Sequence, residues 1–155
     1  MPVTSRRGDT GSALVLVPAT VLILLALGAL VVDAAVVFLG ERSLQAAAAT
    51  AATDAVSQLD DPLFYRSGQV AIDPARAVAT ADQSVASQAL SGLQLIGSPQ
   101  VSVVGRQVCV ALSGRVRPVF GRSIPGFGAG TVVTARATAT AAGDQGPTVE
   151  QRRIC

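Results

Sequence analysis

The chain has 155 residues and a formal net charge of +2, and half of its residues are hydrophobic. This length accommodates one small domain plus a membrane segment, and so small a charge, with its arginines scattered, argues against nucleic acid as a partner. Aromatic residues make up only 3% and Trp is absent, so a core must be built from Val, Leu and Ala. Because such residues bury little area each, we expect a membrane or partner subunits to support the fold.

The side chains that usually carry catalysis are missing. The chain has no His, which removes the commonest general base and the commonest metal ligand. All twelve basic residues are Arg, so the Ser and Thr hydroxyls also lack a Lys to activate them. Two Cys are too few for a zinc site. The sequence therefore predicts a protein that is not an enzyme and that has no cofactor, no metal and no small-molecule substrate.

The most apolar part of the chain is an uncharged run from Ala13 to Val32, and apolar residues resume after Asp33 as far as Gly40. A helix rises about 1.5 Å per residue, so about 20 residues cross a hydrocarbon core roughly 30 Å thick. Signal peptides have shorter apolar regions of about 7 to 15 residues. We therefore expect residues 13–40 to form an uncleaved transmembrane helix, with the lipid bilayer as a partner.

The charges that flank this run predict its orientation. Arg6 and Arg7 outweigh Asp9 before the run, whereas Glu41 and Arg42 cancel on the other side. By the positive-inside rule, residues 1–12 form a basic cytoplasmic flank of a single-pass protein in the cell (inner or cytoplasmic) membrane, and the bulk of the chain lies outside. An Arg-Gly-Asp motif at residues 7–9 then faces away from any external receptor. A twin-arginine export signal is an alternative for the same residues.

Three residues interrupt the uniform anchor. Pro18 removes one backbone hydrogen bond and is expected to kink the helix. Gly28 offers a smooth surface that another helix can approach. Asp33, near the outer end of the span, is costly unless it finds a partner or reaches the headgroups. Two interpretations of Asp33 stay open: pairing with a positive group on a partner subunit, and hydration at the interface.

Residues 43–59, SLQAAAATAATDAVSQL, follow the anchor without a helix breaker before Pro62. Ala is the best helix former, so the anchor is expected to continue as one helix to about Leu59. One stripe of this helix carries Leu44, Ala48, Ala51 and Ala55. Because small side chains at helical spacing allow close approach, the stripe predicts a packing surface. Low-complexity sequence without a structural role is the alternative.

A second helix is expected beyond a loop. Residues 60–62, DDP, predict a stop, and residues 63–65 form an apolar patch in the loop. Asp73 followed by Pro74 has the pattern of an N-cap with proline at the first helical position. This helix should end near residue 90 or 91. Its buried face is expected to consist of Ala75, Val78, Ala79, Val85, Ala86, Ala89 and Leu90.

The remainder alternates with the period of β-strands. Strands are predicted over 100–104, 107–117 and 131–141, with a hairpin turn at Gly105-Arg106. One side of the first two strands carries Val101, Val103, Val108, Val110 and Leu112. An antiparallel sheet covered on one face by helices belongs to the α+β class. We expect residues 41–142 to form this extracytoplasmic domain and residues 143–155 to be a flexible tail.

Two features of this region suggest contacts. The loop at residues 118–130 is rich in Gly and Pro but carries Val119, Phe120, Ile124 and Phe127. A loop this apolar covers a core, binds a partner or touches the membrane; covering the core is preferred.

The two cysteines, Cys109 and Cys155, can form a disulfide in an oxidising compartment, and closing so long a loop stabilises a fold by a few kcal/mol. Free thiols and intermolecular pairing are the alternatives.

Taken together, the first sixty residues resemble the TadE/TadG-like proteins of tight-adherence (Flp) pilus assembly systems. The resemblance rests on the order of Arg7-Gly8, Pro18, Asp33, Phe38, Arg42 and Leu44-Gln45, followed by Ala-rich sequence with Asp54. The strand at residues 132–142 is similar in style to the end of that family. The resemblance implies a minor pilin-like or pilus-assembly subunit of a type IV-like secretion system. Its partners would be other pilus-assembly or pilin-like membrane subunits.

The chain also departs from a processed pilin leader. Such leaders resemble a Gly followed, five residues after cleavage, by Glu, whereas counting from Gly8 and Gly11 gives Ala13 and Leu16. We therefore expect the anchor to be retained. The alternative function is a membrane-anchored module whose external sheet binds a cell-envelope ligand.

Overall fold

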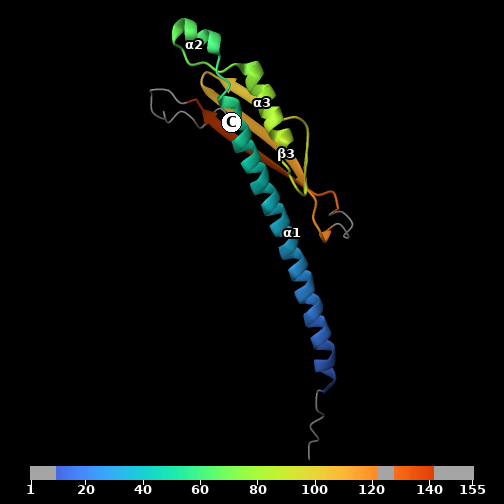
Figure 1. The fold of residues 1–155 in the computed structure, drawn as a ribbon. Coiled ribbons are helices and arrows are strands. Elements are labelled where there is room, and N and C mark those ends of the chain that lie inside the picture. The colour runs from blue at the N-terminus through green and yellow to red at the C-terminus, as the bar shows by residue number, and fades with distance from the viewer. Residues whose placement is uncertain (1–9, 122–127, 142–155) are drawn as a thin grey trace, which may run out of the picture.

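A computed structural model describes residues 10–121 and 128–141, with side chains from Leu16 onward (Figure 1). Within these residues, three helices precede four strands. Their bounds are α1 Thr10–Val56, α2 Asp61–Ser67, α3 Pro74–Ser87, β1 Leu93–Leu95, β2 Gln100–Val104, β3 Gln107–Val116 and β4 Thr131–Thr140.

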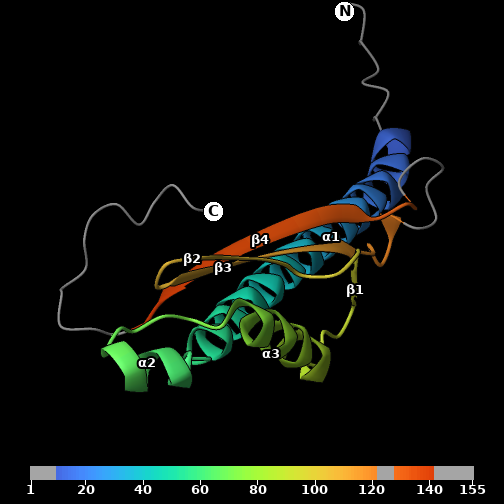
Figure 2. The same ribbon diagram turned by 90° about the horizontal axis from the view of Figure 1, so that it is seen from above.

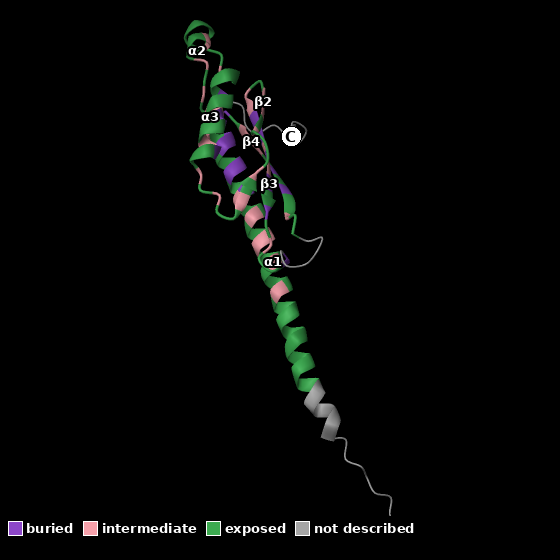
Figure 3. Ribbon diagram, turned by 90° about the vertical axis from the view of Figure 1, so that its right-hand side faces the viewer, coloured by how far each residue is buried: buried purple, intermediate pink, exposed green. Residues whose placement is uncertain are grey.

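Helix α1 is a single helix of 47 residues that joins the apolar run to the Ala-rich segment. Its N-terminal half extends away from the rest of the protein, whereas its C-terminal half lies against the sheet (Figures 1 and 3). The predicted continuation is therefore confirmed, with an end at Val56 rather than Leu59. Pro18 lies inside α1 without ending it; the predicted kink stays a prediction.

The sheet is antiparallel and is organised around β3. Strand β4 pairs with β3 along its whole length, from Gln107 opposite Thr140 to Val116 opposite Thr131. Strands β2 and β1 pair with successive parts of β3, so they share its other edge. The hairpin between β2 and β3 turns at Gly105, whose φ of 59° is easily adopted by glycine. The three predicted strands are confirmed, whereas the short β1 had not been predicted.

Helices α1 and α3 lie side by side on one face of this sheet (Figure 2). Helix α1 packs under β3 and β4, and α3 packs under β2. The core between these layers consists mostly of Ala from the helices and mostly of Val from the strands. Its fully buried members include Leu44, Ala47, Ala48, Ala51, Ala55, Ala77, Ala81, Val108 and Val110. The result is the predicted α+β fold: a long apolar N-terminal helix packed on a small antiparallel sheet, in a pilin-like arrangement.

The buried face of α3 differs from the predicted one. Ala77, Ala81 and Val85 are buried, whereas Val78 is 40% exposed. Of the predicted set, Ala75, Ala79, Ala86 and Ala89 are also exposed and Leu90 is half-buried. Ala occurs on every side of this helix, so apolar spacing does not define a unique face. The face that α3 turns toward α1 is instead the one that carries Ser84, whose hydroxyl donates a hydrogen bond to Asp54 Oδ2 of α1 at 2.6 Å.

Two helix boundaries were also predicted wrongly. The segment expected to be a loop at residues 63–65 lies within α2, because Asp60 accepts a hydrogen bond from Leu63 N at 3.1 Å and caps the helix. Helix α3 begins as predicted, with Asp73 accepting from Ala75 N and Arg76 N. It ends at Ser87, earlier than expected, where Gln88 takes an extended conformation.

Helix α1 approaches β3 closely at Gly40. A Cβ placed on Gly40 would overlap the Cγ2 atom of Val116, which is a stiff and fully buried side chain on β3. Glycine inside a helix otherwise costs about 0.5–1 kcal/mol relative to Ala. The close packing of α1 on β3 therefore requires glycine at position 40.

Replacing Gly40 with Ala is expected to lower the free energy of unfolding by about 1–2 kcal/mol, because overpacking outweighs the gain in helix propensity. Gly28→Ala is the matched control, since a Cβ there meets nothing within 4 Å. Urea unfolding of both variants in detergent, followed by circular dichroism, measures the difference. Adding Val116→Ala to Gly40→Ala should recover part of the loss, and equal stability of the two glycine variants would contradict the packing argument.

Candidate functional site

The N-terminal half of α1, from Leu16 onward, is exposed (Figure 3), and almost all of its residues are apolar. Its large side chains are exposed throughout, among them Leu16, Val17, Val21, Leu22, Ile23, Leu24, Leu25, Leu27, Leu30 and Val31. A helix that is apolar all round is either buried in a large core or inserted in a membrane. Helix α1 is thus long and apolar enough for a membrane span or a signal sequence, and it is the one such helix among the described residues.

Asp33, where this apolar half ends, is bound by the loop that follows β3. Its Oδ1 accepts hydrogen bonds from the backbone N–H of Val119 at 2.7 Å and of Phe120 at 2.9 Å. Its Oδ2 accepts a third from Gly121 N at 2.7 Å. Consecutive N–H groups that converge on one carboxylate form an anion-binding concavity. The contact joins positions 88 residues apart in sequence at its widest.

The chain around this contact is shaped to reach the carboxylate. Pro118 follows the end of β3 and lacks an N–H of its own, so the donors begin at Val119. Gly121 is buried against the helix, and a Cβ there would come within 3.2 Å of Asp33 Oδ2. The side chains of Val119 and Phe120 point elsewhere and remain 44% and 50% exposed. Backbone groups thus satisfy Asp33, while the apolar side chains stay available.

This arrangement bears on the two interpretations of Asp33. Both carboxylate oxygens are engaged by backbone N–H groups of the same chain. Pairing of Asp33 with a positive group on a partner subunit stays a prediction. The sequence indicated that Asp33 needs a partner and that the loop at 118–130 needs a contact. That the backbone of Val119, Phe120 and Gly121 binds Asp33 was not predicted. Every residue except Pro has a backbone N–H, so such donors cannot be recognised from residue types.

A groove of about 700 Å³ runs between α1 and the same loop. Asp33 and Thr131 are its polar lining residues. The others are Ile23, Ala26, Leu27, Ala29, Leu30, Ala34, Val37, Pro118, Phe120 and Gly121. The groove therefore extends the apolar surface of α1 up to the base of the sheet. Its chemistry suits hydrocarbon or an apolar helix rather than a polar metabolite.

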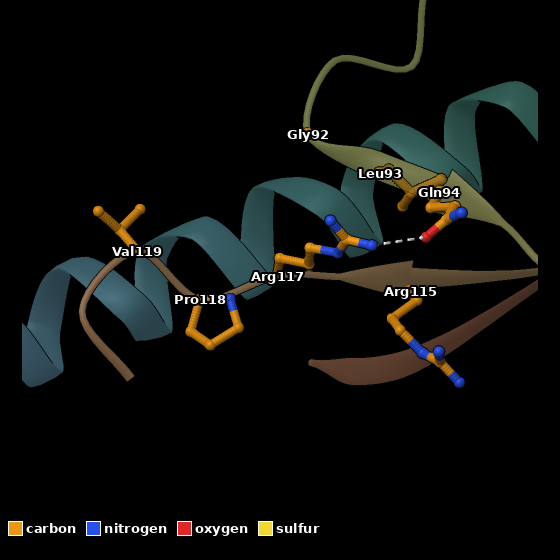
Figure 4. A pocket seen from close by; sticks show the side chains of 7 residues that line it. All are labelled: Gly92, Leu93, Gln94, Arg115, Arg117, Pro118 and Val119. Carbon is orange, nitrogen blue, oxygen red and sulfur yellow. Dashed lines mark hydrogen bonds between the residues drawn. The ribbon is translucent and has the colours of Figure 1, made fainter. Parts of the chain in front are cut away.

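A second hollow, of about 370 Å³, opens at the same end of the sheet, between the end of β3 and β1 (Figure 4). Arg115 and Arg117 line it together with Gln94, and Arg117 Nη2 donates to Gln94 Oε1 at 3.3 Å. The other lining residues are Gly92, Leu93, Pro118 and Val119, so the hollow contains no acidic side chain. Both Arg side chains are exposed. This pair was not predicted from the sequence.

The remaining predicted residues fall into three groups. Leu44, Ala48, Ala51 and Ala55 are fully buried at the interface of α1 with the sheet and α3. Gly28 has no contact for an added Cβ, so an approach of another helix there stays a prediction. Arg6, Arg7, Ile124, Phe127, Cys155 and the tail lie outside the described residues.

Cys109 is buried on β3 between Val108 and Val110, which face α1. Its predicted disulfide involves Cys155, so the bridge stays a prediction.

Metal-ligand geometry is not found in the part of the chain that the structure describes, where no three His, Cys, Asp or Glu side chains gather. Neither a scan of protein-family models nor searches of curated proteins and of solved structures finds a match to this chain. Function is therefore inferred from the geometry of the chain itself.

Proposed function

We propose that this protein is a non-enzymatic, membrane-anchored, minor pilin-like subunit of a tight-adherence (Flp, type IV-like) pilus assembly or secretion system. In this proposal, residues 13–40 span the cell membrane with the N-terminus in the cytoplasm, and the sheet domain lies outside. The partners are other pilin-like or assembly subunits in the same membrane. The observation that carries the proposal is the apolar N-terminal half of α1, which is exposed on every side and continues into a packed domain.

Hydrophobic burial explains why this surface needs an environment other than water. Exposed apolar patches on soluble monomers rarely exceed a few hundred Å², whereas here every large side chain from Leu16 to Leu30 is accessible. Burial of apolar area is worth about 25 cal/mol per Å². Lipid or neighbouring apolar helices provide that burial, and the resemblance of the first sixty residues to pilus-assembly subunits favours both.

Continuity of α1 supports an anchor that is retained. A cleavable signal peptide ends its apolar region in a small-residue site before the mature domain. Here the helix passes without a break from the apolar half to the buried Leu44 and Ala48. Asp33 is bound to the loop of the folded domain as well. The end of the apolar run is thus part of the folded domain, which is the arrangement expected of an anchor.

Membrane anchoring is tested by placing charges in the middle of the span. Leu22→Arg combined with Leu25→Arg should move the protein out of the alkali-resistant membrane fraction of cells, because each Arg at a helix centre costs about 2.5–3.5 kcal/mol. Tyr65→Arg with Val78→Arg is the matched control, since it adds the same charge at exposed positions of α2 and α3. The anchor would be contradicted if alkali extracted the two double variants equally. It would also be contradicted if alkali extracted the wild-type protein.

Assembly is tested separately by co-purification from native membranes in mild detergent. The proposal expects pilus-machinery subunits to co-purify with the full chain. Recovery of a lone monomer would count against a subunit role and in favour of a membrane-anchored binding module. N-terminal sequencing of the recovered protein then distinguishes a retained anchor, which begins before residue 13, from a processed chain.

A further inference from the structure

The two arginines at the end of β3 lie at a defined level relative to α1. Val116 contacts Gly40, and Gly121 contacts Asp33. The chain from 116 to 121 therefore descends beside α1 from residue 40 to residue 33. Seven helical residues correspond to about 10 Å at 1.5 Å per residue. The uncharged residues 13–32 suffice to cross the hydrocarbon core, and residues 33–40 of the proposed span then cross the headgroup layer. The segment 116–121, beside residues 33–40, therefore lies in the headgroup layer immediately outside the hydrocarbon core.

Charge at this level is positive and unpaired. Neither Arg115 nor Arg117 has an ion pair in the part of the chain that the structure describes, where Arg76 pairs with Asp73. The carboxylate nearest the membrane, Asp33, is occupied by backbone N–H groups. Glu41 lines a different surface of α1, beside Arg42. Figure 4 shows Arg117 turned toward Gln94 and Arg115 turned away from both, so the end of β3 presents two separate exposed guanidinium groups to anions.

Two apolar side chains lie between these arginines and the apolar half of α1. Val119 and Phe120 come two to three residues after Arg117 and are about half exposed. Their backbones are held at Asp33, which places both side chains lower along α1 than the arginines. The arginines thus lie farther from the apolar half of α1 than Val119 and Phe120 do. A protein surface at a membrane interface has this order, because Arg contacts lipid phosphate and apolar side chains contact acyl chains.

We propose that residues 115–120 form a membrane-contacting edge, in which Arg115 and Arg117 bind phospholipid phosphate groups and Val119 and Phe120 enter the apolar border of the bilayer. This proposal rests on the proposed membrane anchor. It adds that the sheet domain sits directly on the outer surface of the membrane and selects anionic lipid. Guanidinium groups match phosphate oxygens with paired N–H donors, and each basic residue near an anionic surface is worth about fivefold in lipid affinity.

The chain has no Trp, so a single introduced Trp reports its own position without background. Full-length Leu24→Trp, Phe120→Trp and Tyr65→Trp are each reconstituted in vesicles containing brominated phospholipid, which quenches nearby Trp. Leu24 lies in the proposed span, and Tyr65 is 86% exposed on α2, at the far end of the domain (Figure 1). We expect quenching at Leu24→Trp by lipid brominated deep in the acyl chain. Phe120→Trp should be quenched by lipid brominated near the headgroup, and Tyr65→Trp by neither.

The outcomes separate the two proposals. An unquenched Leu24→Trp overturns the anchor, and the membrane-contacting edge with it. A quenched Leu24→Trp with an unquenched Phe120→Trp overturns the edge alone.

Lipid selectivity tests the arginines in the Phe120→Trp background. Brominated phosphatidylglycerol should occupy the site in preference to brominated phosphatidylcholine by about fivefold if one Arg contributes and about twenty-five-fold if both do. Arg115→Gln with Arg117→Gln should abolish this preference, whereas Arg66→Gln with Arg76→Gln, which removes the same charge far from the edge, should retain it. Inorganic phosphate at millimolar concentration should not compete. Competition by phosphate would assign the hollow to a free anion, and an unchanged preference in the Arg115 and Arg117 variant would refute their role.

Discussion

Asp33→Ala is expected to release the loop after β3 from α1. Three backbone N–H groups lose their acceptor in this variant. Because the loop is held by these bonds to a charged acceptor, which are stronger than neutral ones, amide hydrogen exchange of residues 119–121 should accelerate about tenfold or more. Exchange is measured by mass spectrometry on the full chain in lipid nanodiscs. Amides of β3 beside Val108 should keep their protection, since they belong to the core.

A graded series makes this result specific to geometry. Asp33→Asn retains one oxygen, which can still accept from Val119 and Phe120, but it turns an amide group toward Gly121 N–H; its exchange should be intermediate. Glu41→Ala removes a carboxylate that is exposed on the same helix and should leave the loop unchanged. If Asp33→Ala and Glu41→Ala behave alike, the three hydrogen bonds do not hold the loop.

Ala51→Leu is expected to destabilise the sheet domain by about 1–3 kcal/mol. Ala51 is completely buried where α1 faces the core, and added methylene groups in a close-packed core force neighbours out of their preferred rotamers. Ala and Leu have nearly equal helix propensity, so the change acts through packing. Urea unfolding of the full chain in detergent, followed by circular dichroism, gives the free energy of unfolding.

Ala49→Leu provides the comparison within the same helix. Ala49 is exposed two residues away, and surface substitutions usually change stability by no more than about 0.5 kcal/mol. A loss at Ala51 together with near-wild-type stability at Ala49 identifies the Ala stripe as a packing surface. Similar losses at both positions would mean that helix formation, rather than contact with the sheet, limits stability.

Much of the fold could be predicted because it follows from local patterns. The apolar run, the Ala-rich continuation and the cap at Asp73 lie within a few residues of what determines them. The same holds for the strands around Gly105, whose alternation matches the observed pairing of Val101 with Val110. Periodicity and turn residues are local properties, and they carry the α+β class without further information.

The errors concern choices that depend on tertiary contacts. Helix α3 is so rich in Ala that each of its sides looks suitable for burial, and only its contacts with α1 and β2 select Ala77 and Ala81. Strand β1 is three residues long and pairs with the end of β3, which no alternation over so short a segment predicts. The site itself was half predicted: Asp33 was identified as needing a partner, but its donors are backbone groups far along the chain.

The continuity of α1 has a mechanical consequence. A helix turns by about 100° per residue, so the number of residues between the apolar half and Leu44 sets the direction in which the sheet lies around the helix axis, relative to the exposed apolar side chains. The hydrogen bonds at Asp33 attach the loop after β3 to α1 as a second connection between the helix and the sheet domain. Rotation of the apolar half of α1 about its axis is therefore transmitted to the sheet domain as torque, and the two parts turn together.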